Sequence, residues 1–401
     1  MIDELESVYN LYPFILTEDQ EHLRREIREF AAREIAPHVM TWDEANEFPA
    51  DVVKKLGAMG LLGIIFPPEY GGAGLGYVDY VLAIEELSAV DGSVGITLAA
   101  HNSLGTNHIF LAGNEAQRRK YVPRLASGEW LAAWGLTEPG SGSDAGGART
   151  TAVKSGDGYV LNGNKTFITN GRYADVAVVI AVTDKSKGTH GLSAFVVEKG
   201  TKGFRPGKKE NKLGLRASDT SELIFEDCEI PAENLLGAEG EGFIDAMRVL
   251  DGGRISIAAL ALGIGRGALD AALKYVKERR QFGKTIAEFQ GIQWKFAEMA
   301  VKLDAAQLLL YRAASSARDG RLPSAYETSI AKYAANTAGF EVANESLQVM
   351  GAMGYSTHTL VEYCLRRTRG WMIAGGSLEM LKNRIAESVF NQRFPQRTPT
   401  M

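Results

Sequence analysis

Residues 135–144 read Gly-Leu-Thr-Glu-Pro-Gly-Ser-Gly-Ser-Asp, and they follow the point, near Trp130, at which the pattern of the chain changes from helical to β. Before this segment, Leu23 and Ile27 recur at helical spacing, and the residues from Thr17 to Gln20 have the spacing of a capping box. The segment itself combines hydroxyl side chains with flexible backbone. Such a loop at a strand end offers donors to a polar ligand, and an ordinary surface loop has the same composition.

The region after the segment is rich in short β-branched and apolar runs. Turn signals of the Asp-Gly and Asn-Gly type stand at Asp157-Gly158, Asn162-Gly163 and Asn170-Gly171. The runs are too close together for helical crossovers, so a small antiparallel sandwich or barrel is expected. The predicted strands cover residues 159–161, 166–169, 176–182, 194–197 and 223–225.

Helical periodicity dominates on both sides of this β region. The expected helices include residues 78–87, 94–108, 257–275, 299–311 and 330–350, with a loop at Pro67-Pro68 and Gly71–Gly74. The fold class is therefore α+β with several domains. We expect a helical N-terminal domain over residues 1–130, a β domain over 131–240 and a helical C-terminal domain over 241–401.

Composition excludes several classes of protein. The 401 residues carry 44 basic and 49 acidic side chains, a balance that argues against binding to nucleic acid. The apolar runs are interrupted before they reach a membrane-spanning length, and the acidic residues 1–6 show no secretory signal. Two cysteines, Cys228 and Cys364, make no disulfide framework, and no zinc-ligand spacing is present. We expect a cytoplasmic protein without a metal, nucleic-acid or membrane partner.

Two glycine-rich segments resemble nucleotide-binding motifs but lack their context. Gly263–Gly267 lies inside a helical pattern rather than between a strand and a helix, so close packing of two helices is the favoured interpretation. No Lys-Ser or Lys-Thr pair follows Gly71–Gly76, which excludes a P-loop. Phe167 and Thr169 stand two apart on one face of a predicted strand. That arrangement suits a flat ring, although an ordinary half-buried strand looks the same.

Several segments together resemble the acyl-CoA dehydrogenase family, and the resemblance spans essentially the whole chain in order. Residues 135–144 resemble the first signature of the family, and residues 165–170 resemble its flavin-facing strand, with Phe167 where Trp is usual. The further matching segments are 68–72, 278–284, 289–291 and 347–351. The family fold has an N-terminal helical domain, a middle β domain and a C-terminal four-helix bundle, in agreement with the three regions above.

This resemblance implies bound FAD, a CoA thioester substrate, a homotetramer and an electron-transfer flavoprotein as electron acceptor. The residues expected to contact the flavin within one subunit are Leu136, Thr137, Ser143, Phe167 and Thr169. Those expected at the adenosine diphosphate part across a subunit contact are Arg279, Phe282, Gln290 and Gln348–Gly351, with Ser377 and Glu379 as further FAD contacts. Substrate contacts carried over are Ser143, Asp251, Arg254 and Gly375. A solvated helix-end charge is the alternative for Arg279.

The usual catalytic base of the family is missing from this chain. Oxidation of an acyl thioester removes an α proton, which requires a positioned carboxylate. In most members this Glu stands at the position of Gly375, and some branched-chain members place it at the position of Gly253. Glu379 is close in sequence but matches an FAD-contact position, so a role as a relocated base is disfavoured.

Two kinds of chemistry remain possible without that base. If the α carbon already belongs to a double bond, it has no proton to lose, and conjugation acidifies the γ carbon instead. In the second kind of chemistry, the flavin is a structural or polarising group, and the enzyme is a non-redox lyase of the desulfinase type. The resemblance implies that the helix beginning after Asp91 lines the acyl pocket, and no other acid stands in the pocket-lining motifs. Asp91 is therefore the candidate base for the first chemistry, although Asp before Gly-Ser is also a favoured helix cap. His101 and Asn102, further along, could orient the ring or the base, although a lone histidine is more often packed.

We therefore expect FAD-dependent 1,4-elimination on cyclohex-1-ene-1-carboxyl-CoA, giving cyclohexa-1,5-diene-1-carboxyl-CoA in aromatic compound degradation. Asp91 would take the proton and flavin N5 the hydride. The resemblance implies that a backbone N–H on the Glu379 side and a ribityl hydroxyl polarise the thioester carbonyl. The alternatives are an ordinary α,β dehydrogenase with a relocated base, the desulfinase-type lyase and a helical scaffold that holds no flavin.

Overall fold

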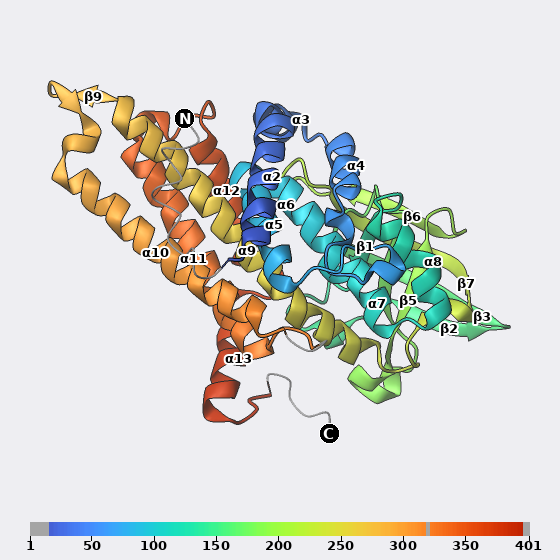
Figure 1. Ribbon diagram of the computed structural model, residues 1–401. Helices are drawn as coiled ribbons and strands as arrows, with labels where there is room; N and C mark the ends of the chain where they lie inside the picture. Colours follow the sequence, from blue (N-terminus) through green and yellow to red (C-terminus); the bar gives the residue numbers. More distant parts are fainter. Residues whose placement is uncertain (1–15, 318–320, 396–401) are drawn as a thin grey trace.

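A computed structural model describes residues 16–317 and 321–395 of the chain, and the acidic residues 1–6 lie outside the described residues. The described chain forms a helical N-terminal part, a β domain and a long C-terminal helical bundle (Figure 1). The predicted order of helical, β and helical regions is confirmed.

The N-terminal part consists of seven described α-helices, of which α5 packs against α2 and α6. Thr17 caps the first helix through the predicted capping box with Gln20. The predicted helix over 94–108 is interrupted, because the chain widens into a π-helical turn at His101–Thr106. The helices are α2 (Glu18–Glu34), α3 (Val39–Ala45), α4 (Ala50–Ala58), α5 (Tyr77–Val90), α6 (Gly92–Ala100), α7 (Asn107–Ala112) and α8 (Glu115–Ala126).

The β domain is one eight-stranded sheet in which β6-β7-β3-β2-β4-β5-β8 are neighbours and β1 pairs with β4. Most pairs are antiparallel, as predicted, but β1 and β2 pair with β4 in parallel. The strands are β1 (Ala132–Gly135), β2 (Thr151–Ser155), β3 (Gly158–Thr169), β4 (Val176–Val182), β5 (Leu192–Glu198), β6 (Phe204–Lys209), β7 (Thr220–Pro231) and β8 (Leu235–Leu236).

One predicted turn of the β domain is wrong. The Asn162-Gly163 pair lies inside β3, which runs on from Gly158 to Thr169 and stays paired with β7. The register shifts between Leu161 and Gly163, so the pair makes a bulge rather than a hairpin. The two other turn signals are confirmed: a tight turn joins Ser155 to Gly158, and Asn170 takes a left-handed conformation directly after β3.

The C-terminal part is a bundle of four helices, with a fifth helix packed on α11. Its members are α9 (Gly242–Glu278), α10 (Gln290–Ser315), α11 (Ala325–Val349), α12 (Leu360–Trp371) and α13 (Leu378–Phe390). Helix α9 is long and apolar enough to cross a membrane, but 83% of its most apolar stretch is buried in the protein. It packs against α5, α10, α11 and α12, so it is the central helix of the molecule.

The glycines of α9 allow the N-terminal and C-terminal parts to approach closely. A Cβ atom at Gly263 would lie 2.3 Å from the carbonyl oxygen of Glu85, and one at Gly267 would lie 2.1 Å from that of Ala89. No side chain fits at these distances. The interpretation of this segment as a helix-packing surface is therefore confirmed.

Candidate active site

The loop after β1 is held by a buried ion pair. Glu138 accepts a hydrogen bond of 2.6 Å from Lys165 and further bonds from the backbone N–H groups of Arg149 and Thr150. Burial alone would raise the pKa of Glu138, but the charge and hydrogen bond of Lys165 override it and lower the pKa. Lys165 also donates to the carbonyl oxygen of Leu136. The pair thus fixes the start of the 135–144 segment.

Next to this loop, β3 presents an aromatic side chain that the described chain leaves uncovered. Phe167 has a φ of 57°, which is uncommon for a residue other than glycine, and its side chain is 62% exposed. The register of β3 against β7 shifts between Lys165 and Ile168, and this bulge turns Phe167 outward. Thr169 is half-buried on the same strand, and Thr166 donates its N–H to the carbonyl of Thr137. Leu136 is buried and Ser143 is exposed.

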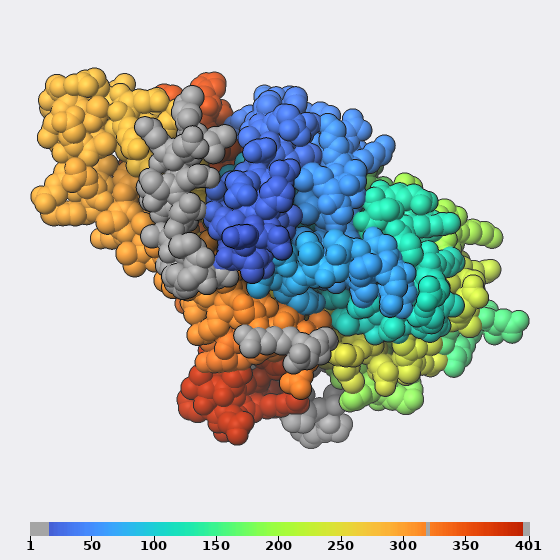
Figure 2. Space-filling model, viewed as in Figure 1, coloured from blue at the N-terminus to red at the C-terminus, as the bar shows by residue number. Residues whose placement is uncertain are grey.

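A second group of predicted contacts gathers at the far end of the bundle. Strands β9 (Arg280–Gln281) and β10 (Lys284–Thr285) form a tight hairpin whose turn contains Phe282. The Phe282 side chain is 94% exposed. Arg279 ends α9, Gln290 begins α10, and Gln348 and Gly351 lie at the end of α11. Figure 2 shows this end projecting from the body of the molecule, and Figure 1 places it opposite the β domain.

The two positions that lack a carboxylate lie on two sides of one region beside α9. A Cβ at Gly375 would lie 3.5 Å from Cγ1 of Ile257, and one at Gly253 would lie 3.4 Å from Oγ of Ser103. Gly253 and Ile257 are one helical turn apart, so the π-helical turn and the segment 371–376 approach neighbouring turns of α9. Gly375 has a φ of +67°, which an L-residue adopts only with strain.

An ion pair and a lysine adjoin this region. Asp251 and Arg254 pair with each other on α9, and burial lowers the pKa of the Arg254 guanidinium despite that pairing. Lys332 of α11 is completely buried. Its Cε atom would be 3.7 Å from a Cβ at Gly375. Sequence reasoning missed this lysine, and the available signal was one cation inside the otherwise apolar and small-residue run 330–335.

The candidate base Asp91 is completely buried at the start of α6. Its Oδ1 accepts hydrogen bonds from the N–H of Ser93, the Tyr363 hydroxyl at 2.9 Å and Arg367 at 3.0 Å, whereas Oδ2 has no partner among the described residues. Burial raises the pKa of Asp91, and the charge of Arg367 opposes that shift. Asp91 therefore caps the helix, as one interpretation predicts, and keeps one carboxylate oxygen free.

The side chains of His101 and Asn102 serve the fold. His101 accepts from the N–H of Ala132 through Nδ1 and meets the carbonyl of Leu125 through Nε2, and burial lowers its pKa to about 4. Asn102 donates to the carbonyl oxygens of Leu61 and Leu98. Both side chains are thus committed to the backbone, so the packed-histidine interpretation applies.

Ser377 and Glu379 occupy the first turn of α13. The Ser377 hydroxyl caps the helix by accepting from the N–H of Met380. Glu379 is exposed, and backbone hydrogen bonding at the helix start, followed by the Ser377 hydroxyl, lowers its pKa. A general base for a weakly acidic proton needs a raised pKa, so this environment disfavours Glu379 as a relocated base.

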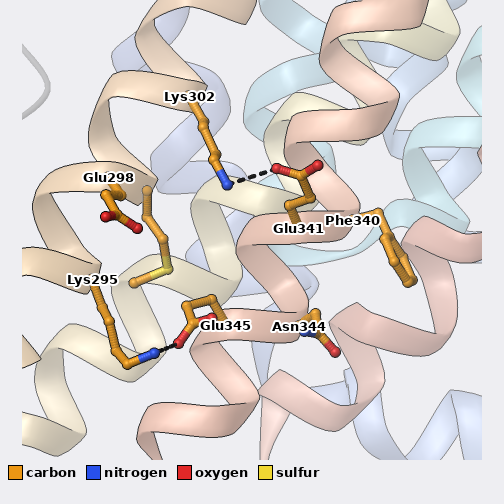
Figure 3. A pocket seen from close by; sticks show the side chains of 8 residues that line it. Lys295, Glu298, Lys302, Phe340, Glu341, Asn344 and Glu345 are labelled. Carbon is orange, nitrogen blue, oxygen red and sulfur yellow. Dashed lines mark hydrogen bonds and ion pairs between the residues drawn. The ribbon is translucent and has the colours of Figure 1, made fainter.

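A hollow between α10 and α11 is separate from all these residues (Figure 3). Two ion pairs cross it, Lys302 with Glu341 at 2.7 Å and Lys295 with Glu345. Most of the side chains that line it are charged, and four of them form these two ion pairs. The hollow therefore offers no apolar pocket for an acyl group.

Comparison with known proteins agrees with this arrangement. The N-terminal, middle and C-terminal domains of acyl-CoA dehydrogenases match residues 17–129, 133–228 and 240–390. The chain is 47% identical to a short-chain specific acyl-CoA dehydrogenase of Clostridium acetobutylicum, over 94% of this chain and 99% of that protein. It is 42% identical to a subunit of the caffeyl-CoA reductase–Etf complex of Acetobacterium woodii, over 91% and 96%.

A solved structure gives the same result. Butyryl-CoA dehydrogenase of Megasphaera elsdenii superposes with a TM-score of 0.91 at 42% identity, covering 94% of this chain and 99% of that one. The protein belongs to the acyl-CoA dehydrogenase family. It is an FAD-dependent flavoprotein oxidoreductase that dehydrogenates CoA thioesters.

The residues present fit FAD. The uncovered Phe167 ring beside Thr137 and Thr169 provides a flat apolar surface with polar groups at its edge, as an isoalloxazine ring requires. The names of the relatives above refer to short-chain, butyryl-CoA and caffeyl-CoA enzymes. They support the family and the cofactor but show no preference for an alicyclic acyl group.

Proposed function

We propose that this enzyme acts on a CoA thioester whose acyl group is an already unsaturated ring, converting cyclohex-1-ene-1-carboxyl-CoA to cyclohexa-1,5-diene-1-carboxyl-CoA. The observation that carries this proposal is the presence of glycine at both 375 and 253, which adjoin neighbouring turns of α9. A saturated thioester needs a base at its α carbon, and neither position supplies one. In the cyclohexene thioester the α carbon has no proton, so that base is unnecessary.

The reaction removes one proton and one hydride. The proton leaves the γ ring carbon, and the electron pair of that C–H bond forms a new double bond to the β carbon. The former α,β double bond shifts to join the α carbon to the ring carbon on its other side. Hydride leaves that carbon, and bound FAD supplies the acceptor for it. The chain's own residues must therefore bind the thioester, polarise its carbonyl and accept the γ proton.

Asp91 is the residue we propose to accept this proton. Its free Oδ2 and its raised pKa suit a base, and Tyr363 and Arg367 hold Oδ1 in place. Gly92 approaches Ile264 of α9, whereas Gly375 approaches Ile257. The start of α6, where Asp91 stands, thus meets α9 about two turns further along than the segment around Gly375 does. Asp91 therefore approaches the acyl group from another direction than a carboxylate at position 375 would.

Asp91→Asn tests this role, because Asn caps helices as well as Asp does. We expect turnover of the cyclohexene thioester to fall by about 10²- to 10⁴-fold while FAD stays bound. Asp43→Asn is the matched control. Asp43 is also buried, and it pairs with Arg366, which stands next to Arg367 on helix α12. Equal rates in the two variants would remove Asp91 from the mechanism.

We also propose that the enzyme is a homotetramer in which two copies share each FAD. Phe167 belongs to the β domain, whereas Phe282 and Arg279 lie at the opposite end of the molecule (Figure 1), so one copy cannot bring both groups to one cofactor. Helix α10 also exposes Trp294, Val301 and Leu308 at intervals of seven residues, which place them on one face. Sedimentation of wild type and of Val301→Glu, which charges this face, tests the assembly. A monomeric wild type would contradict it.

The substrate class can be tested by following flavin reduction with butyryl-CoA, cyclohexanecarboxyl-CoA and cyclohex-1-ene-1-carboxyl-CoA, with an electron-transfer flavoprotein as the proposed acceptor. We expect the cyclohexene thioester alone to bleach the flavin rapidly. Rapid bleaching by butyryl-CoA would instead favour the ordinary dehydrogenase with a relocated base, the alternative to which the short-chain relatives point. Gly375→Glu then provides a direct control, because a restored carboxylate should raise activity on the saturated thioesters.

A further inference from the structure

A buried lysine holds the segment 371–376, in which the usual base position lies. Lys332 has no exposed surface, and its Nζ donates to the carbonyl oxygens of Gly376 at 2.6 Å, Ala374 at 2.9 Å and Trp371 at 3.4 Å. One turn further along α11, Asn336 also donates to the carbonyl of Trp371. These two side chains therefore hold most of the segment through its backbone.

Lys332 has no acidic partner among the described residues. An isolated buried ammonium group is costly, and the carbonyl oxygens that surround it compensate for this only in part. Burial, followed by the charge of Arg254, lowers the pKa of Lys332 to about 7. Lys332 thus lies at this site without a counter-ion among the described residues, and its hydrogen bonds all go to the segment 371–376.

The bonds of Lys332 set the direction in which two backbone N–H groups point. In a trans peptide unit the C=O and N–H bonds point in opposite directions. Since the carbonyls of Ala374 and Gly376 face Lys332, the N–H groups of Gly375 and Ser377 face away from it. Neither N–H donates a hydrogen bond to another of the described residues. Both are therefore available to a ligand on the side opposite Lys332.

We infer that Lys332 is a positioning residue, which keeps the Gly375 N–H aimed at the thioester carbonyl by holding the Ala374 and Gly376 carbonyls behind it. This inference rests on the proposed function, in which the thioester carbonyl must be polarised; the resemblance implies a backbone N–H on the Glu379 side for that role, and we assign it here to the Gly375 N–H. It applies to any CoA thioester that the enzyme oxidises. Gly375 and Gly376 have positive φ values of 67° and 89°, which glycine adopts freely. Because glycine restricts its backbone so little, the bonds from Lys332 select this conformation of the turn.

Lys332 does not itself serve as the base. Its N–H groups are directed at three carbonyl oxygens, so the protonated form is the one that these bonds select. The charged groups nearest to it are Arg254, which pairs with Asp251, and then Arg384, which acts on Arg254. The net local charge is positive, and it favours loss of the Lys332 proton as the pH rises. Deprotonation leaves two donors for three carbonyls.

The test compares Lys332→Met and Lys332→Gln with Lys302→Met, which removes an exposed lysine from the hollow in Figure 3. We expect kcat of Lys332→Met to fall about 100-fold, the size of effect seen when an oxyanion donor is lost, with KM and FAD content nearly unchanged. Lys332→Gln keeps two donors and should recover part of that loss. Lys302→Met should have the same kcat, KM and FAD content as wild type.

The pH profile separates positioning from a general loss of structure. In wild type, kcat should decline as the pH rises through about 7, the pKa of Lys332. In Lys332→Gln, whose side chain does not titrate, this decline should be absent. If Lys332→Met misfolds, the Lys332→Gln profile decides alone. An unchanged kcat together with an unchanged profile would overturn the inference.

The assay uses whichever thioester bleaches the flavin, which keeps the two proposals distinguishable. Oxidation of butyryl-CoA but not of the cyclohexene thioester would contradict the proposed substrate and leave the Lys332 experiment intact. Rapid oxidation of the cyclohexene thioester by Lys332→Met would contradict only the positioning role.

Discussion

Among the residues that the structure describes, two lysines are completely buried, Lys165 in the β domain and Lys332 in the C-terminal bundle. Each holds a loop that the cofactor or substrate is proposed to meet, but by different means. Lys165 has a carboxylate partner, Glu138, at 2.6 Å, whereas Lys332 has only backbone carbonyls. Burial lowers the pKa of both lysines, and only in Lys165 does a carboxylate oppose the shift.

This difference indicates that Lys165 holds its loop permanently, whereas the way in which Lys332 holds its segment depends on pH. Breaking a buried ion pair is costly, so we expect the Lys165–Glu138 pair to keep the loop after β1 in place. A cation bound to neutral carbonyls can lose a proton near neutral pH. The segment 371–376 is therefore the part of the site whose geometry responds to solution conditions.

Lys165→Met should have the largest effect on stability. It leaves the carboxylate of Glu138 buried without its cation, so we expect a loss of about 3–5 kcal/mol in the free energy of unfolding, measured by urea denaturation. The double variant Lys165→Met/Glu138→Gln should regain much of the loss, because no unpaired charge remains. A Lys165→Met protein as stable as wild type would mean that the pair is not the support described above.

The dependence of stability on pH should reveal Lys332. Its pKa is about 7 in the folded protein and its ordinary value is 10.5, so between these values the unfolded chain binds more protons. The stability contributed by this site therefore increases with pH in that window, by about 1.4 kcal/mol per pH unit. Urea denaturation of wild type and Lys332→Met at pH 7.5 and 9.5 measures this. Parallel pH dependence in the two proteins would contradict the buried, shifted lysine.

A smaller effect is expected at the turn that Lys332 holds. Gly375→Ala adds a Cβ at ordinary contact distances, 3.5 Å from Ile257 and 3.7 Å from Lys332, so only backbone strain opposes it. At a φ of +67° this strain is about 1–2 kcal/mol. Thermal unfolding of the variant beside wild type measures it. An unchanged melting temperature would show that the turn takes another conformation in solution.

The smallest effect should come from an exposed lysine. The side chains of Lys302 and Glu341 are each 45% exposed, and solvent screens such a pair. Lys302→Met should change the free energy of unfolding by less than about 1 kcal/mol. A change as large as that of Lys165→Met would remove the basis for the comparison between buried and exposed lysines.

Local sequence patterns predicted those elements whose stability comes from nearby residues. The capping box from Thr17 to Gln20 and strand β4 over residues 176–182 were predicted in this way. The Asn162-Gly163 turn was wrong because pairing with β7 along the whole of β3 outweighs the local preference for a hairpin. The π-helical turn at His101–Thr106 also had no local signal in the sequence.

The candidate site divides in the same way. Motif residues such as Thr137, Phe167 and Phe282 were identified from order and spacing along the chain. Lys332 was missed, because nothing near it in sequence shows that its partners are carbonyls some 40 residues away. The resemblance indicates Asp91 because it is the one acid in the motifs that line the acyl pocket of the family, but its contacts with Tyr363 and Arg367 come from a helix more than 270 residues further on.

The sequence by itself determined the order of the three regions, the family and the absence of a carboxylate at positions 375 and 253. These features depend on residue identity and on periodicity, which are properties of the chain alone. Only the tertiary structure decided which groups face the space left by those glycines. That arrangement depends on how α9, α11 and the segment 371–376 pack, and packing brings together backbone carbonyls and one buried cation whose positions no local pattern encodes.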